Sequence, residues 1–127
     1  MRGRLLTALA VTGAALLVAG VTEAKQVGVT VSSPPSRLAA GERWNARLTT
    51  WVAGRPRTRP GAHPSVTIER IGPLAMPVAS FHARAVGRPG RYVVSVVFPA
   101  AGRWQYVVTG VGAGEWHFAP VNVTPQR

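Results

Sequence analysis

The sequence predicts an all-β sandwich, and three observations lead to this fold class. After residue 24, no window places apolar residues at helical spacing for three turns. Apolar and polar residues instead alternate over short stretches, which is the two-residue period of a strand with one buried face. The 11 prolines and 14 glycines of the chain separate these stretches with frequent turns.

Residues 1–24 have the pattern of an export signal that precedes the sandwich. Two arginines stand before residues 5–21, and this run of 17 residues contains only Leu, Ala, Val, Thr and Gly. Thr22 and Ala24 form a small-x-small cleavage pattern, so we expect a mature domain of residues 25–127. The alternative is an uncleaved membrane anchor, because this length is at the lower limit of a bilayer span. In both cases residues 25–127 are expected outside the cytoplasm.

Three strands are predicted in the first half of the mature chain. The first covers residues 27–32 and stops before two consecutive prolines. The second covers residues 44–52, where Trp51 falls on the face opposite Trp44. An exposed, basic loop over residues 53–64 leads to the third strand, at residues 66–71.

Four further strands complete the sandwich. A turn-rich piece, residues 74–77, precedes the first of them, and Pro120 indicates an edge position or a bulge for the last. Trp44 and Trp104 open long strands and are expected in the core between the sheets. Seven strands of this kind predict an immunoglobulin-like sandwich. The four strands are expected at residues 81–85, 92–98, 104–109 and 115–123.

Charge and cysteine content limit the classes of partner. The chain has no cysteine, so neither disulfides nor thiolate metal sites are available to it. Without residues 1–24, 13 Lys and Arg face 3 Glu, a net charge of +10. Such a surface is compatible with an acidic envelope protein, a cell-wall polymer or peripheral contact with an anionic membrane. Nucleic acid is not expected outside the cytoplasm.

Two stretches of the chain resemble the YtkA-like and FixH-like families of exported sandwich domains. The first has a Gly90-x-Tyr92 strand, an apolar alternation, a turn at residues 99–102 and then Trp104. The second is residues 38–46, with a Gly-x-x-Trp strand that ends in Trp44. The resemblance covers roughly residues 34–110. It implies an immunoglobulin-like fold in a periplasmic or membrane-associated setting, and for some members copper handling or oxidase assembly.

Four side chains are candidate ligands for a copper ion. Imidazole and thioether groups together suit copper outside the cytoplasm. The alternative is that the histidines are solvated or make local hydrogen bonds. His82 follows Phe81 and His117 follows Trp116, so each is expected to point away from the core. The candidates are His63, Met76, His82 and His117.

The mature chain lacks the residue sets of common catalytic sites. It has no Asp, and no Gly-x-Ser-x-Gly elbow occurs, so no enzyme is expected. Glu42, Glu69 and Glu115 are interpreted as surface counter-charges to the arginines. The glycine-rich residues 110–114 are interpreted as a turn between strands, because no helix follows them to bind a phosphate.

Trp51 and the arginines of the basic loop form a candidate partner-binding site. Trp beside Arg is typical of interaction hot spots; the alternative is that both faces of this strand are covered. The candidate residues are Trp51, Arg55, Arg57 and Arg59. We therefore expect a monomeric or weakly associating, exported, non-catalytic binding or accessory module of the cell envelope. A copper-handling domain is the alternative function.

Overall fold

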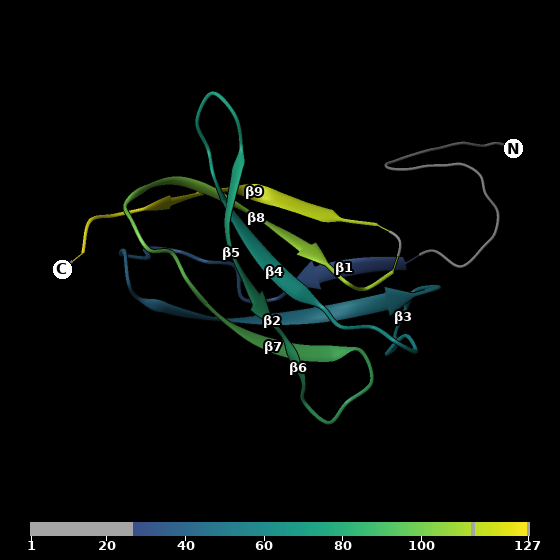
Figure 1. The fold of residues 1–127 in the computed structure, drawn as a ribbon. Helices are drawn as coiled ribbons and strands as arrows, with labels where there is room; N and C mark the ends of the chain where they lie inside the picture. The colour runs from purple at the N-terminus through teal and green to yellow at the C-terminus, as the bar shows by residue number, and fades with distance from the viewer. Residues whose placement is uncertain (1–26, 113, 127) are drawn as a thin grey trace, which may run out of the picture.

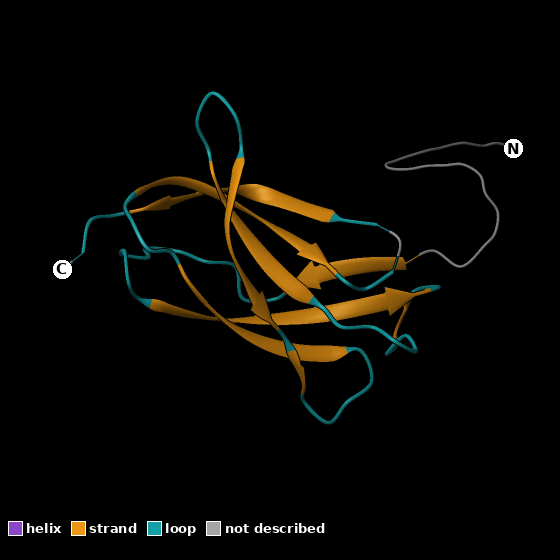
Figure 2. Ribbon diagram, viewed as in Figure 1, coloured by secondary structure: helices purple, strands orange, loops and turns teal. Residues whose placement is uncertain are grey.

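A computed structural model describes residues 27–112 and 114–126, and these residues form strands and loops without a helix (Figures 1 and 2). The predicted all-β class is therefore confirmed. The predicted export signal and its cleavage position lie outside the described residues. Within the described part of the chain, no helix is long and apolar enough to cross a membrane.

The first sheet, here the β2–β7 sheet, has the strand order β1-β2-β7-β6, and the short β3 also pairs with β2. All of its pairings are antiparallel. Its long central strands carry buried residues at alternate positions, so one face packs against the other sheet. The strands are β1 (Val27–Val31), β2 (Arg43–Val52), β3 (Arg55–Pro56), β6 (Arg84–Ala85) and β7 (Arg91–Val97).

The second sheet, here the β4–β8 sheet, has the order β5-β4-β8-β9. Together the two orders correspond to the A-B-E-D and C′-C-F-G sheets of an immunoglobulin-like sandwich. Each of the seven predicted strands has a counterpart. β3 is an additional strand of two residues, and the strand expected at residues 81–85 is divided between the end of β5 and the two-residue β6. The strands of this sheet are β4 (Ser65–Arg70), β5 (Met76–His82), β8 (Gly102–Thr109) and β9 (Trp116–Val123).

One strand predicted as continuous passes from one sheet to the other. β5 belongs to the β4–β8 sheet, β6 belongs to the β2–β7 sheet, and Ala83 between them donates its N–H to the Pro64 carbonyl at 2.9 Å (Figure 1). The predicted start of this strand and the turn over residues 74–77 are wrong, because β5 begins at Met76. Pro77 is tolerated because β5 is an edge strand with a register shift.

The core between the sheets is built around four aromatic side chains. Trp44 meets Tyr106 edge to face at 5.0 Å between ring centroids, and Phe98 meets Trp104 in the same way at 5.6 Å. All four are buried, which confirms the predicted positions of Trp44 and Trp104. Burial also raises the pKa of the Tyr106 hydroxyl, because desolvation disfavours the phenolate.

Tyr92 gives a stability prediction. Its hydroxyl is buried and has no hydrogen-bond partner among the described residues. Because an unsatisfied buried polar group costs desolvation free energy, we expect Tyr92→Phe to increase the free energy of unfolding by about 1 kcal/mol. Urea unfolding of the two proteins measures this difference. A loss of stability in the variant would mean that the hydroxyl has a partner, and would contradict the prediction.

Candidate functional site

Trp51 lies on the outer face of the β2–β7 sheet, as its position out of phase with the core predicts. It is half-buried, and its Nε1 donates a hydrogen bond to Thr30 Oγ1 at 2.9 Å. Across the strands it faces Gly28 on one side and Pro56 on the other. Its indole is therefore partly covered by its own sheet.

The three loop arginines of the predicted site have different neighbours in the fold. Arg55 is exposed on β3, where its cross-strand partner is Val52 and not Trp51. Arg57 is fixed by its backbone, because its N–H donates to the Thr50 carbonyl at 3.0 Å and its carbonyl accepts from Thr50 Oγ1 at 2.5 Å. Arg59 is half-buried and reaches the glycine-rich turn at Gly112. The structure therefore does not gather these arginines around Trp51.

A different set of arginines gathers on the outer face of the β2–β7 sheet. Trp44, Ala46 and Leu48 point into the core, so Arg47 points outward from β2. Its cross-strand neighbour on β7 is Val93, which in turn pairs with Arg84 on β6. Arg91 lies on the same face of β7, one outward position from Val93. Three strands thus contribute exposed arginines to one face.

Three hollows of similar size connect these arginines. The first, of about 440 Å³, contains Arg47, Arg84 and His82 in its lining. The second, of about 410 Å³, contains Arg47, Arg88 and Arg91. The third, of about 430 Å³, contains Arg57 and Arg88. Because Arg47 joins the first two hollows and Arg88 joins the last two, they form one surface, here the basic track: Arg57, Arg88, Arg91, Arg47 and Arg84.

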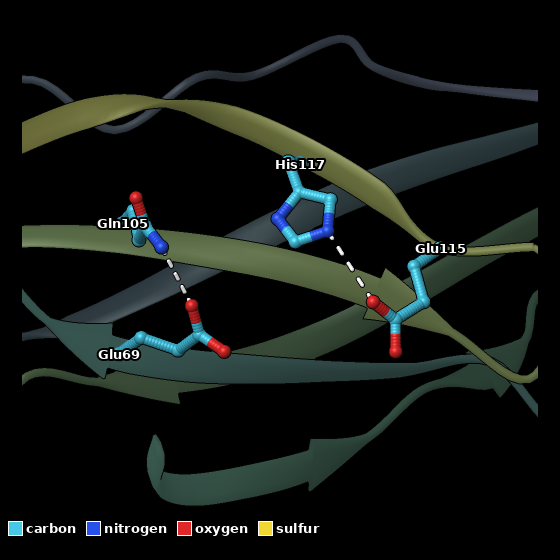
Figure 3. A network of polar contacts seen from close by, with 4 residues as sticks. All are labelled: Glu69, Gln105, Glu115 and His117. Carbon is cyan, nitrogen blue, oxygen red and sulfur yellow. Dashed lines mark hydrogen bonds and ion pairs between the residues drawn. The ribbon is translucent and has the colours of Figure 1, made fainter. Parts of the chain in front are cut away.

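No carboxylate is among the described residues that line the basic track. Two of the three glutamates of the predicted mature chain belong to the side of the other sheet: Glu69 lies on β4, and Glu115 lies directly before β9 (Figure 3). Glu69 accepts a hydrogen bond from Gln105 Nε2 at 2.6 Å, and Glu115 lies 3.3 Å from His117 Nε2. Their contacts are with Gln105 and His117, and the expected role of Glu69 and Glu115 as surface counter-charges stays a prediction. Neither of these two carboxylates is among the residues that line the basic track.

The third glutamate belongs to the turn before β2. Glu42 Oε1 accepts the Ala39 N–H at 2.9 Å, and the Glu42 N–H donates to the Ala39 carbonyl at 3.1 Å. The side chain therefore closes this turn. Its predicted place in a turn is confirmed.

The predicted copper ligands are exposed, and two of the histidines contact neighbouring polar side chains. His82 Nδ1 lies 3.0 Å from Ser65 Oγ, and His117 pairs with Glu115. His82 and His117 both point away from the core, as predicted. His63 lies in the loop before β4, where its backbone N–H donates to the Gly110 carbonyl at 2.9 Å.

The sheet separates most of these four side chains. β5 and β9 are opposite edges of the β4–β8 sheet, so three strand spacings, about 14 Å, separate the strands of His82 and His117, and the two residues are also offset along the strands. Met76 and His82 stand at the two ends of β5. His63 lies toward the His82 end, two residues before β4 begins. In the described part of the chain, no three His, Cys, Asp or Glu side chains are grouped so as to hold a metal ion.

The basic track was missed in the sequence, although part of its signal was there. The alternation in residues 43–52 is enough to predict that Arg47 and Trp44 point to opposite faces of the same strand. It does not say which strand lies beside β2, and Arg84, Arg88 and Arg91 follow 37 or more positions later. The strand order β2-β7-β6 assembles the surface.

No family model, no curated protein and no solved structure matches this chain. The resemblance to YtkA-like and FixH-like domains, with its copper implication, stays a prediction.

Proposed function

We propose that this protein is a non-catalytic binding module that holds an anionic partner or surface against the outer face of the β2–β7 sheet. The observation that carries the proposal is the basic track: five exposed arginines around three connected hollows, with no carboxylate among the described lining residues. A surface of one sign attracts ligands of the other sign and raises their association rate.

The chemistry of the track suits oxyanions. A guanidinium presents a planar set of N–H donors that matches carboxylate and phosphate groups in two parallel hydrogen bonds. Hydroxyl and amide groups stand among the arginines and can add neutral hydrogen bonds: Asn45 and Ser95 in the first hollow, Ser32 and Thr49 in the second, and Thr58 in the third. The ligand class is therefore an anion with several charged groups.

The length of the track favours an extended ligand over a small molecule. Each hollow is open to solvent, so a single ion pair there contributes little free energy. A chain that carries repeated negative charges can occupy several arginines at once and displace their counterions together. Given the predicted export, we place this ligand in the cell envelope, as an acidic protein segment or an anionic polymer.

Binding of poly-glutamate and of inorganic polyphosphate tests the proposal. We expect Arg47→Gln/Arg91→Gln to weaken binding of at least one of these probes by about tenfold or more, because two charge-assisted contacts are lost. The matched control is Arg55→Gln/Arg103→Gln, which removes the same charge from exposed positions outside the three hollows. Fluorescence anisotropy at low and physiological salt measures both dissociation constants.

The control separates a site from a general charge effect. We expect the Arg55/Arg103 double variant to bind within about twofold of the unaltered chain at physiological salt, where distant charges are screened. Equal losses in both double variants would show that net charge alone attracts the probes. That result, or no measurable binding of either probe, would overturn the proposal.

A further inference from the structure

Exposed apolar side chains are concentrated in one segment of the fold. Among the described residues, the large hydrophobic side chains that stay exposed are Leu74 at 75%, Met76 at 59%, Val78 at 50% and Val86 at 39%. The first three belong to the β4–β5 hairpin, and residues 71–78 are here called the hairpin tip. Figure 1 shows this hairpin projecting from the body of the sandwich, at the end opposite β6. Exposed apolar clusters of this kind mark protein or membrane contacts.

The hairpin tip is uncharged, but two arginines lie at its base. Residues 71–81 contain no Asp, Glu, Lys, Arg or His, in a chain with 15 Lys and Arg. Arg103 lies beside the base, since its carbonyl accepts the Ile71 N–H at 3.0 Å. Arg70 lies over the Trp104 ring at 5.5 Å, and its Nη2 donates to the Ala101 carbonyl at 3.1 Å. An apolar projection is thus flanked by two arginines.

The edge of β5 is poorly suited to adding another strand. Pro77 has no N–H to donate, and the pairing of β5 with β4 shifts register opposite Ile68 and Glu69. Both features are devices that blunt an edge strand against pairing. Contacts at the hairpin tip must therefore be made by its side chains. A second copy of this chain would also bring Arg70 and Arg103 of each molecule together, which like charges oppose.

We infer that the hairpin tip inserts Leu74 and Met76 into the surface of an anionic lipid bilayer, with Arg70 and Arg103 at the headgroups. Membrane-surface binding gains from buried apolar area and from attraction between basic residues and anionic lipid. The tip supplies the first and its base supplies the second. This contact goes beyond the proposed function, because it uses neither Trp51 nor the basic track. It leaves the track, near β6, directed away from the membrane.

A fluorophore at the hairpin tip tests this contact in the full chain. The chain has no cysteine, so Ala75→Cys accepts a single environment-sensitive label. Ala85→Cys is the matched control, because Ala85 is also an exposed alanine but lies on β6. We expect vesicles of phosphatidylcholine with phosphatidylglycerol to shift the emission of the Ala75 label to shorter wavelength and to leave the Ala85 label unchanged.

Side-chain variants establish which residues insert. Leu74→Ser/Met76→Ser should lower the ratio of inserted to exposed Ala75 label by about tenfold or more, because two apolar side chains are removed from the lipid. Val86→Ser, which alters an exposed apolar residue after β6 and outside the hairpin tip, should leave the ratio unchanged. Arg47→Gln/Arg91→Gln should also leave it unchanged, so that failure of the basic track and failure of the membrane contact remain distinguishable.

Three results would overturn the inference. One is an Ala75 label that does not respond to either phosphatidylglycerol vesicles or pure phosphatidylcholine vesicles. The second is an equal response to both, since the arginines would then select no anionic lipid. The third is an unresponsive label that a purified envelope protein shields, which would identify the tip as a protein contact.

Discussion

Replacing Gly110 by alanine should lower the free energy of unfolding by about 3 kcal/mol or more, because two separate costs add at this position. Gly110 has a φ of 82°, in the left-handed region where a Cβ is disfavoured. A Cβ there would also collide with the backbone carbonyl of His63. The backbones of His63 and Gly110 are held together by a hydrogen bond of 2.9 Å from the His63 N–H to the Gly110 carbonyl.

Gly54 provides the matched control for this substitution. Its φ is 80°, but a Cβ at Gly54 would meet no atom within 4 Å. Gly54→Ala should therefore cost only the conformational strain, about 1 kcal/mol. Urea unfolding of the two variants measures the difference. Similar losses at Gly110 and Gly54 would contradict the close packing of the glycine-rich turn against the end of the basic loop.

The second large effect is expected at Trp104. Trp104→Ala should cost about 3 to 5 kcal/mol, because it leaves a cavity in the core and removes a large apolar side chain. Trp104 is 1% exposed, contacts Phe98 edge to face, and donates its Nε1 hydrogen to the Ala100 carbonyl at 3.0 Å. A loss of this size is comparable to the whole stability of a small domain, so the variant should be largely unfolded near 37 °C.

Trp51→Ala is the matched tryptophan substitution. Trp51 is half-buried on an outer face, and its hydrogen bond to Thr30 is exposed. We expect a loss of about 1 to 2 kcal/mol from the partial loss of apolar burial. Thermal unfolding followed by circular dichroism compares the two variants. A Trp51 variant as unstable as the Trp104 variant would mean that the outer face of β2 is packed as a second core.

The side-chain pattern of individual strands could be predicted from the sequence, because it depends only on neighbours along the chain. A strand alternates its side chains with a period of two, so one large apolar residue sets the inward positions of the whole strand. Trp44 and Trp104 lie in the core, and His82 and His117 outside it, as the alternation predicts. It also gave the fold class, since alternation and frequent turns are local features.

The strand order could not be predicted in this way, because it depends on contacts between distant residues. The order β2-β7-β6 places Arg47, Arg84 and Arg91 on one face of the sheet. In the predicted site, by contrast, Arg55 pairs with Val52 and Arg59 reaches Gly112. The order β5-β4-β8-β9 puts His82 and His117 on opposite edges of a sheet. The alternation of residues along a strand also does not predict which residues pack against an apolar turn. Leu74 and Met76 remain largely exposed among the described residues.

Which side of the long strands β2 and β8 faces the core thus follows from local pattern, because the two-residue period of a strand is a property of the backbone. Which outward residues become neighbours depends instead on how the strands pair. Residues far apart in the chain meet only when whole strands pair and sheets pack, and that arrangement minimises the free energy of the entire domain. Both proposed surfaces, the basic track and the hairpin tip, belong to this second level.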